Sequence, residues 1–579
     1  MILAIYSTFE QMHGRKSSIS ELIERLRPFS RDSVLTLCAF ISILLKLWDS
    51  TAPDLDRYDH LVACSFDWLR GDWYKLAARL PEPEFVFHRR QLLLISKLAI
   101  LHCDDEGLDV WRIPPGPFGT ILLMANDHFH YGLTPEMGKD EFENVKRLFA
   151  EFIPVAEGAG SRPEYRIVRA RLMLEQANKM RHHPEFIDIP AEFLNRTGMS
   201  LEDYEALCFG LFAKCATLSL ADLDRGPSAF TFIEENFHAT AMAHESIRLF
   251  LKDMAAPPSI SRTEILQRDY GTNDFTEARK HPLCSISNGY LPLDVLFAIE
   301  KFETGPYWVV NDISAEKGTR LRRFWGAVFE AYMNSLVSGS LVGTNSLFIP
   351  DPRRADDKAI QICDGLMLQG SSLVLLEYKA NMFTAETKYS GNFTALAAEI
   401  EKKLVRGTSE RGKSKKKGVE QLADAVLQLF GESKKATIAG LDLSGVKRVY
   451  PLLVTLDAIG ASLLLSRLLK HYFSRSIVDA HFSDVQIMPL MCTDVQSFEE
   501  VAACFPTMGL VSILDYWMSK DPNLISSLAA HSIPQLQGHP NDRLSSEWLR
   551  ISERICARLF PKEHAAAQWS KRVHPDQVR

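Results

Sequence analysis

The sequence predicts an α+β fold, and three observations support this expectation. Residues 1–280 carry apolar residues at helical spacing between Pro and Gly breaks. Short apolar runs of strand length appear within residues 301–500, and helical spacing returns after residue 498. We therefore expect a large, mainly helical region over residues 1–300, a strand-containing domain over 301–500 and a helical C-terminal extension over 501–579.

The first region contains several segments with helical spacing of apolar residues. The expected helices cover residues 20–26, 85–102, 141–152, 164–182 and 201–218. A further apolar run, residues 34–45, is about twelve residues long, which is too short for a membrane span of about 20 residues. It predicts a buried helix.

Composition limits the kind of protein. The chain has 579 residues, of which 46% are hydrophobic, and this is enough for about two to four domains with sizeable cores. Its net charge of -7 means that binding to a polyanion requires a local basic patch. The 10 cysteines form no C-x-x-C pair and the N-terminus has no basic leader. These features favour a reducing cytoplasm and no membrane partner.

The central domain alternates helix and strand signals. Leu321, Phe324, Trp325, Val328, Phe329, Tyr332 and Leu336 form one stripe of a helix with Glu330 in its middle. Apolar runs at residues 362–368 and 373–380, separated by Gly-Ser-Ser, predict a β-hairpin. A second helix begins near residue 418, and strands are expected at 448–455 and 485–490. The order is helix, three strands, helix, strand, or αβββαβ.

Three polar residues interrupt the apolar hairpin: Asp364, Glu377 and Lys379. Because side chains alternate along a strand, Glu377 and Lys379 share one face. Burial of a carboxylate and an ammonium group is costly without partners or a metal, so a functional site is one explanation. An ordinary ion pair at a strand end is the alternative.

The joint order of these motifs resembles the PD-(D/E)XK nuclease superfamily, whose domain has a restriction-endonuclease-like core. The resemblance covers about residues 314–460 and depends on residues 326–330, Asp364 with Gly365, residues 377–379 and residues 418–422. One departure is Cys363, which stands where the family pattern has proline. The resemblance implies a metal-dependent nuclease that hydrolyses phosphodiester bonds.

The resemblance also implies roles for individual residues. Asp364, Glu377, the carbonyl of Tyr378 and Glu330 would hold Mg2+ or Mn2+, which prefer oxygen ligands. Lys379 would orient or deprotonate the attacking water, and Gln421 would position water or phosphate. On a helical wheel, however, Glu330 and Gln421 lie away from the apolar stripes of their helices, so two ordinary surface residues remain the alternative.

A basic segment lies between the hairpin and the second helix. Eight basic residues fall within 16 positions, with Glu410 as the one acid among them: Lys402, Lys403, Arg406, Arg411, Lys413, Lys415, Lys416 and Lys417. Its glycines predict a mobile loop, and its charge suits contact with a nucleic-acid backbone near the proposed metal site. A solvated charge run without function is the alternative.

Other motifs are weaker. Asp127, His128 and His130 are residue types that bind metals, but a fourth spaced ligand is missing. No phosphate-binding loop or dinucleotide fingerprint is present in the sequence.

The functional expectation is a DNA endonuclease that resembles effectors of bacterial anti-phage defence or restriction, controlled by a partner protein or by homo-oligomerisation. By the same analogy, residues 1–300 are expected to be a regulatory, sensing or oligomerisation region. A non-enzymatic scaffold or regulator with a nuclease-like core, and a DNA-repair nuclease, are the alternatives. The sequence leaves open DNA against RNA, the trigger and the oligomeric state.

Overall fold

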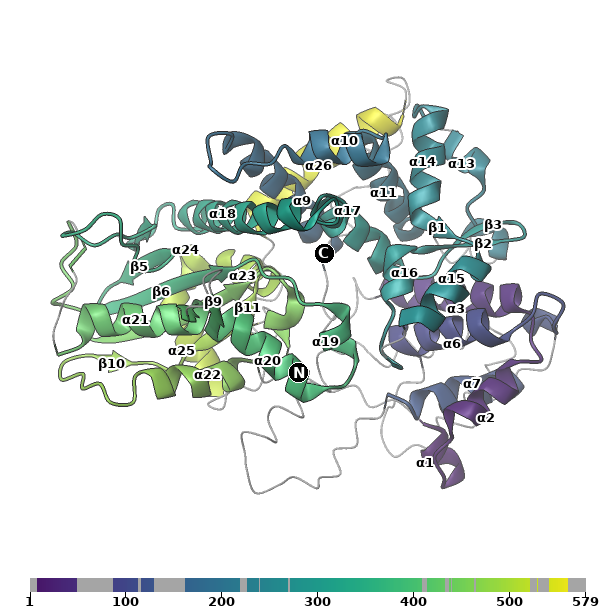
Figure 1. Ribbon diagram of the computed structural model, residues 1–579, viewed down its shortest axis with the longest axis horizontal. Coiled ribbons are helices and arrows are strands. Elements are labelled where there is room, and N and C mark those ends of the chain that lie inside the picture. Colours follow the sequence, from purple (N-terminus) through teal and green to yellow (C-terminus); the bar gives the residue numbers. More distant parts are fainter. Residues whose placement is uncertain are drawn as a thin grey trace. The chain divides into compact units, whose positions relative to one another are not determined.

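The structure is a computed structural model, and Figure 1 shows its helices and strands. It describes residues 8–48, 87–112, 116–129, 162–218, 226–238, 240–268, 271–408, 414–432, 437–438, 440–462, 465–520, 528 and 541–560. The described part combines helices with mixed β-sheets, so the α+β expectation is confirmed.

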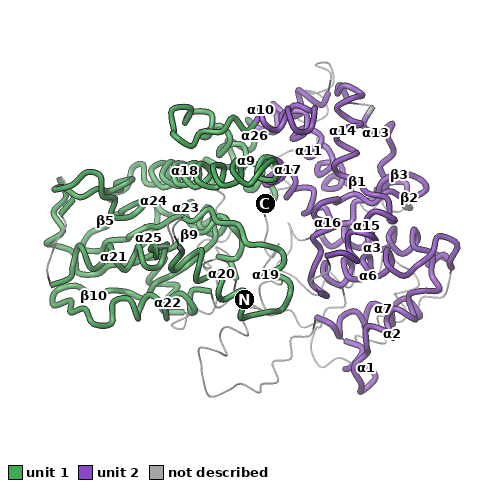
Figure 2. The backbone as a smooth tube through the Cα atoms, in the orientation of Figure 1, with its two compact units in different colours: residues 1, 135–189, 310–550 green, residues 2–134, 190–309, 551–579 purple. Residues whose placement is uncertain are grey.

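The chain forms two compact units, and neither is continuous in sequence (Figure 2). The first unit contains residues 1, 135–189 and 310–550, and the second contains residues 2–134, 190–309 and 551–579. The expected boundaries at residues 300 and 500 stay a prediction. Three helices have residues in both units: α10 (Ile189–Thr197), α17 (Val295–Asn311) and α26 (Asp542–Leu559).

The second unit is mainly helical with one small sheet, in which β1 is parallel to β2 and β2 is antiparallel to β3. Its elements are α1 (Phe9–His13), α2 (Ile19–Leu26), α3 (Arg31–Trp48), α6 (Arg89–His102), η1 (Val110–Arg112), α7 (Gly116–Asn126), α11 (Leu201–Ala216), η2 (Pro227–Ala229), α13 (Glu234–His238), α14 (His244–Met254), β1 (Ala255–Ala256), α15 (Pro258–Arg268), α16 (Thr276–Lys280), β2 (Leu283–Ile286) and β3 (Gly289–Pro292).

The expected N-terminal helices correspond to α2, α6, α9 and α11, and the apolar run at residues 34–45 lies within α3. The expected helix at residues 141–152 lies outside the described residues.

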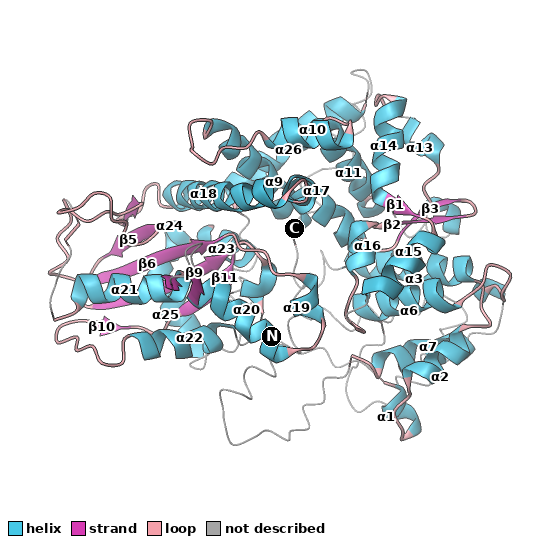
Figure 3. Cartoon of the chain, viewed as in Figure 1, coloured by secondary structure: helices cyan, strands magenta, loops and turns pink. Residues whose placement is uncertain are grey.

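The first unit contains a six-stranded sheet with helices on both faces (Figure 3). Its elements are α9 (Pro163–Lys179), α18 (Ala315–Ser340), β4 (Leu347–Pro350), β5 (Gly365–Gln369), β6 (Ser372–Lys379), α19 (Ala385–Tyr389), α20 (Phe393–Ile400), η3 (Glu401–Val405), β7 (Arg406–Thr408), β8 (Ser414–Lys416), α21 (Gly418–Phe430), β9 (Arg448–Thr455), η4 (Ala458–Ala461), α22 (Leu465–Ser476), β10 (Gln486–Ile487), β11 (Met491–Asp494), α23 (Val495–Ala502), α24 (Phe505–Met508) and α25 (Leu510–Lys520).

The strand order in this sheet is β10, β9, β6, β5, β4, and β11 also pairs with β9. The strands β4, β5 and β6 form an antiparallel meander, whereas β9 is parallel to β6, β10 and β11. The predicted hairpin at β5 and β6 is present, and its turn is made by Gly370, whose φ of 58° suits glycine, and Ser371. Within the expected strand at residues 485–490 only Gln486–Ile487 form a strand, β10, and β11 begins directly after that range, at Met491.

Alternation along β6 decides which helix covers which face. Leu373 and Leu375 belong to the apolar core formed with α20, α21 and α22. Tyr378, which points the other way, contacts Phe329 of α18 edge to face, with ring centroids 6.3 Å apart. The helices α18 and α21 therefore cover opposite faces of the sheet.

Both helices of the predicted motif follow their sequence patterns. The predicted stripe of α18 is buried, and the side chain of Ser314 caps its first turn by accepting from the N–H of Lys317 at 3.1 Å. The helix α21 begins at Gly418, where a Cβ atom would lie 2.9 Å from Leu453 Cδ1 of β9. Glycine therefore allows the start of α21 to lie close against the sheet.

A buried polar network joins α18 to helices from distant parts of the sequence. Arg169 of α9 pairs with Glu499 of α23 at 2.6 Å, and the hydroxyl of Tyr332 donates to the other oxygen of Glu499 at 2.6 Å. The side chains of Arg169 and Glu499 are 4% and 0% exposed. Because each member is hydrogen-bonded, the network holds α18 in a defined orientation under the sheet.

Candidate functional site

The site residues lie at one end of the six-stranded sheet because of the strand directions. The carboxyl ends of β4 and β6 and the amino end of β5 lie together, since Pro350 pairs with Gly365 and Gly365 pairs with Leu376. Asp364 immediately precedes β5. Glu377 and Lys379 are the last two residues of β6 on the face that also carries Leu373 and Leu375. The meander therefore brings the predicted Asp and Glu-X-Lys motifs to the same end.

Glu377 and Lys379 lie on the same face of β6, as the period of two predicts, and the Lys379 ammonium group pairs with Glu377 Oε1. The Glu377 side chain is fully buried, and its second oxygen, Oε2, has no hydrogen-bond partner. Burial and the charge of Asp364 raise the pKa of Glu377 to about 8. Burial alone would lower the pKa of Lys379, but the charges of Glu377 and Asp364 outweigh it and raise that pKa.

Asp364 is 7% exposed and accepts two hydrogen bonds. The backbone N–H of Tyr378 donates to its Oδ2 at 2.7 Å, and the amide of Gln361 donates to its Oδ1 at 3.2 Å. Burial raises the pKa of Asp364. Because the N–H and C=O of a strand residue point to the same side, the carbonyl of Tyr378 also points toward the Asp364 side.

Glu330 reaches the site from α18, and the structure shows why a residue off the main apolar stripe is not at the surface. Gln361 Nε2 lies 3.4 Å from Glu330 Oε1, and the same nitrogen contacts Asp364. Burial, then the charges of Asp364 and Asp351, raise the pKa of Glu330 to about 7. The side chains of Glu330, Asp364, Glu377 and Lys379 thus form one cluster, linked through the amide of Gln361, the backbone of Tyr378 and the ion pair.

Gln421 lies in the first turn of α21 and is half-buried. Its backbone N–H bonds to the carbonyl of Lys417, and no hydrogen bond joins its side chain to the four clustered residues. The helix start itself is close to the cluster, since a Cβ atom on Gly418 would lie 3.4 Å from Lys379 Cε. Gln421 is therefore next to the cluster without being part of its hydrogen-bond network.

The basic segment differs from the predicted mobile loop. Residues 401–405 form the π-helix η3, and β7 pairs with β8 in an antiparallel ladder in which Arg406 lies opposite Lys416. Arg411 and Lys413 lie outside the described residues.

Internal acids neutralise part of the charge of this segment. Arg406 pairs with Glu420 at 2.6 Å, and Lys416 pairs with Asp424 at 2.5 Å. Lys403 pairs with Glu399 and donates to the carbonyl of Met382 at 2.5 Å.

Three further lysines of the segment complete the picture. Lys402 and Lys415 are exposed. Burial lowers the pKa of Lys417, and the charges of Lys415 and Lys379 lower it further. The ammonium group of Lys417 is therefore influenced by Lys379 of the cluster.

Two residues of the cluster were not found by sequence reasoning, namely Gln361 and Asp351. Gln361 is three positions before Asp364, within the loop that joins β4 to β5, and a polar residue in such a loop carries no distinctive signal. Asp351 directly follows β4, and pairing β4 with β5 in register would have placed it opposite Asp364. The register was the signal that could have identified it.

The donor set of the cluster suits a hard divalent cation. Three carboxylates and a strand carbonyl offer only oxygen ligands, and Glu377 Oε2 is a buried oxygen without a partner. As the side chains stand, no three His, Cys, Asp or Glu residues within the described ranges are close enough to enclose a metal ion. The amide nitrogen of Gln361 lies between Asp364 and Glu330, where its partial positive charge bridges the two carboxylates. Mg2+ or Mn2+ fits the chemistry of the site if that amide is displaced.

The second candidate metal site, around Asp127, has a structural role instead. Asp127 accepts hydrogen bonds from the backbone N–H of Glu10 at 3.0 Å, from the N–H of Ser17 at 2.6 Å and from the hydroxyl of Ser17 at 2.7 Å. These bonds occupy the carboxylate and tie α7 to the start of the chain. His130 lies outside the described residues.

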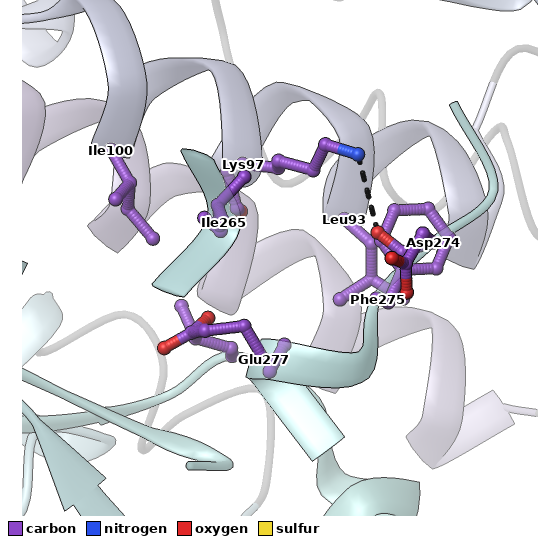
Figure 4. Close-up of a pocket in the computed structure, with 10 residues that line it drawn as sticks. Leu93, Lys97, Ile100, Ile265, Asp274, Phe275 and Glu277 are labelled. Atoms are coloured by element: carbon purple, nitrogen blue, oxygen red, sulfur yellow. Dashed lines mark hydrogen bonds between the residues drawn. The ribbon is translucent and has the colours of Figure 1, made fainter. Parts of the chain in front are cut away.

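A small cavity in the second unit lies between α6, α15 and α16 (Figure 4). Its volume of about 20 Å3 is enough for about one water molecule. Lys97 points toward Asp274 and donates to its backbone carbonyl oxygen at 3.3 Å. The carboxyl group of Glu277 points away from these two residues (Figure 4). Burial raises the pKa of Glu277 to about 7.

Comparison with protein-family models, with curated proteins and with solved structures found no match for this chain. No helix in the described part of the chain combines the length and the apolar character that crossing a membrane requires.

Proposed function

We propose that the first unit is a Mg2+- or Mn2+-dependent nuclease that hydrolyses phosphodiester bonds, with a restriction-endonuclease-like core. One observation carries the proposal: Glu330, Asp364, Glu377 and Lys379, which span about 50 positions of the sequence, are linked in one cluster at a sheet end, with Asp364 and Glu377 buried and Glu330 and Lys379 partly buried. The proposed hydrolysis requires these four side chains to lie together, so a position of any one of them elsewhere in the fold would have argued against it.

The order of elements supports the same core. The helix α18, the three-stranded meander of β4, β5 and β6, the helix α21 and the strand β9 follow one another in the αβββαβ order, with α19, α20, η3, β7 and β8 inserted between β6 and α21. The strand β9 lies beside β6 and parallel to it, and α18 and α21 cover opposite faces. The order of these elements is the one that the resemblance to PD-(D/E)XK nucleases implies, and it supports the proposal.

The residues of the cluster have distinct roles in the proposed reaction. A bound Mg2+ would polarise the scissile phosphate and lower the pKa of a bound water. Asp364, Glu377 and Glu330 supply the anionic oxygens that hold it, and the Tyr378 carbonyl points to the same side. Lys379, kept in place by Glu377, orients the attacking water and offsets negative charge that develops on the phosphate. Gln421, at the start of α21, positions water or phosphate.

The exposed charges of the β7–β8 region provide the proposed contact with nucleic acid. Lys402 and Lys415 are exposed, whereas Lys403, Arg406 and Lys416 have acidic partners. Phosphate contacts through a few lysines suit a chain whose net charge is negative. We propose DNA as the substrate, with the helical second unit as a regulatory or sensing part of a cytoplasmic defence effector controlled by a partner protein or by self-association.

A plasmid-nicking assay with the purified full chain tests the proposal. The expected result is conversion of supercoiled to nicked or linear DNA with Mg2+ or Mn2+ and none with EDTA. Asp364→Asn and Lys379→Ala should each abolish cleavage. Glu547→Gln, which removes an acid from a partly exposed ion pair with Arg550 in the same unit, is the matched control and should cleave normally.

The outcomes separate the candidate functions. Equal cleavage by the wild type and Asp364→Asn would overturn the nuclease proposal. Nucleic-acid binding without metal-dependent cleavage, on supercoiled, linear, branched and single-stranded DNA and on RNA, would favour a scaffold or regulator. Preference for branched or single-stranded ends would favour a repair nuclease.

A further inference from the structure

The helix α22 has a cationic outer face, because its apolar and basic residues lie on different sides of the helix at about 100° per residue. The buried apolar residues on one side are Leu465, Leu468, Leu469 and Phe473. The residues on the other side are partly or fully exposed, and they are Arg467, Lys470, His471, Ser474 and Arg475. The apolar side packs into the core of the six-stranded sheet, and the basic side faces outward.

The positive charge of this face has no acid beside it in the sequence. No Asp or Glu occurs between Asp457 and Asp479, although the chain as a whole has a net charge of -7. Asp457 is already paired with Lys388 at 2.9 Å. The side chains of Lys470 and Arg475 have no ion pair with any other residue that the structure describes.

Outward cations on other helices of the same unit do have acidic partners. Arg323 of α18 pairs with Glu185 at 3.2 Å, and Arg550 of α26 pairs with Glu175 at 3.0 Å. Such pairs are typical of an ordinary solvated surface. The helix α22 differs because its cations share one face without acids, and this is the charge pattern that a polyanion requires.

The helix α22 begins at the end of the sheet where the proposed site lies. The strand β9 is parallel to β6, and its last residue, Thr455, is opposite Lys379. The hydroxyl of Thr455 donates to the carbonyl of Asp457 at 2.7 Å, and η4 then leads into α22. Because β10 and β11 are parallel to β9, α22 runs back along the sheet from the site end.

The same face of the sheet carries the site and α22. Leu373 and Leu375, which share a face of β6 with Glu377 and Lys379, pack in one core with α20, α21 and α22. The helix α22 lies beside α21, whose first turn adjoins Lys379 (Figure 1). A nucleic acid held at the site therefore has α22 next to its path.

The length of the cationic face suits a sugar-phosphate backbone. Arg467 is in the first turn of α22 and Arg475 in the last, so the two are about 12 Å apart along the helix axis. Successive phosphates of one DNA strand are about 3.4 Å apart along the duplex axis, so the face spans about three or four of them. A lipid surface is a poorer fit, because a membrane-binding helix inserts its apolar side and that of α22 is buried in the core.

We propose that the outer face of α22 binds the sugar-phosphate backbone of the nucleic acid that is hydrolysed at the proposed site, with Lys470 and Arg475 as the main contacts. The inference rests on the proposed function. It adds a second contact surface to Lys402 and Lys415 of the β7–β8 region. Contacts of this kind position a duplex and do not read its sequence.

Binding of the full chain to a fluorescent DNA duplex in EDTA tests this surface without cleavage. Fluorescence anisotropy at a series of salt concentrations measures Kd and its salt dependence. The double variant Lys470→Gln with Arg475→Gln should bind at least about tenfold more weakly at low salt, and the slope of log K against log salt should fall by about two, because two phosphate contacts are lost.

A matched control separates a local contact from a general effect of net charge. The double variant Arg323→Gln with Arg550→Gln removes the same charge from the same unit, at residues that have acidic partners. It should bind DNA with the Kd and the salt dependence of the wild type. An equal loss of binding in both double variants would overturn the role of α22.

A crosslinking experiment tests whether α22 lies against the DNA. Ser474 is exposed on the outer face, whereas the nine free cysteines in the described part of the chain are buried. A thiol-reactive photo-crosslinker on Ser474→Cys should join the protein to bound DNA, and wild type treated in the same way should give only background. No crosslink above background would overturn the inference.

The results also distinguish the inference from the proposed function. If Lys470→Gln with Arg475→Gln binds DNA like the wild type, the role of α22 is wrong and the nuclease proposal stands. If this variant loses binding but the wild type shows no metal-dependent cleavage, the α22 surface stands and the nuclease proposal fails. If the wild type binds vesicles of anionic phospholipid through these two residues and binds neither DNA nor RNA, nucleic acid is wrong as the partner.

Discussion

Replacing Asp364 by Asn should stabilise the metal-free protein and at the same time remove its response to metal. Asp364 and Glu330 both contact Gln361 Nε2, at 3.2 and 3.4 Å, so their oxygens are at most about 7 Å apart. Two unit charges at about 7 Å repel by about 2 kcal/mol at an effective dielectric constant of about 20. Loss of the attraction between Asp364 and Lys379 offsets part of this, so the expected net gain is about 1 kcal/mol.

The measurement is the melting temperature in EDTA at pH 8, above the pKa of about 7 of Glu330. A gain of about 1 kcal/mol raises the melting temperature by about 2 °C in a unit of this size. Asn still accepts the hydrogen bond from the N–H of Tyr378, so the fold retains that contact. With Mn2+ the wild type should gain further stability by mass action, and Asp364→Asn should not.

Two results would refute this reasoning. A melting temperature of Asp364→Asn below that of the wild type in EDTA would mean that the carboxylates do not repel one another in the fold. An equal gain with Mn2+ in both proteins would mean that Asp364 holds no cation. Asp424→Asn, which breaks an exposed ion pair with Lys416 worth about 0–1 kcal/mol, should not raise the melting temperature in EDTA and should gain stability with Mn2+ as the wild type does.

Three further predictions concern other residues. The raised pKa of Glu277, about 7 against 4.5 for a free side chain, means that the folded state binds more protons than the unfolded state between these values, so stability falls as pH rises through this window. Glu277→Gln should therefore stabilise the protein by about 1–3 kcal/mol at pH 8 and by little at pH 5, and equal melting temperatures at pH 8 would contradict this. Arg169→Met leaves the buried Glu499 without its cation and should cost about 3–5 kcal/mol in unfolding experiments, whereas a cost below about 1 kcal/mol would show that the pair is not needed. Charge reversal of Lys402 and Lys415 should weaken DNA binding and reduce its salt dependence by about two counterions, and unchanged binding would exclude this region from the interface.

Local sequence patterns were sufficient for the individual elements of the first unit. The stripe from Leu321 to Leu336 predicted α18, and the two apolar runs around Gly370 predicted the hairpin of β5 and β6, because periodicity of 3.6 or 2 reflects which face is buried. The same period correctly placed Glu377 and Lys379 on one face. The type of each element and the face on which a side chain lies depend on residues that are close in sequence, so the sequence alone is enough to predict them.

The basic segment shows where local patterns were insufficient. Its glycines and lysines predicted a loop, whereas the chain forms η3 and the β7–β8 ladder, and acids from elsewhere, such as Glu399 and Glu420, neutralise part of its charge. Partners far along the chain determine how much of a charge run is available to a ligand. Composition alone does not contain this information.

By itself, the sequence determined the helices, the hairpin and the identity of the acids and the lysine that were expected to act together. Only the tertiary structure decided that α18 turns Glu330 toward Asp364, that Gln361 lies between them and that the register of β4 with β5 brings Asp351 to the same place. The physical reason is that helix orientation and strand register are set by packing across the sheet, including the buried pairing of Tyr332 with Glu499, and such contacts join residues that are far apart in the chain.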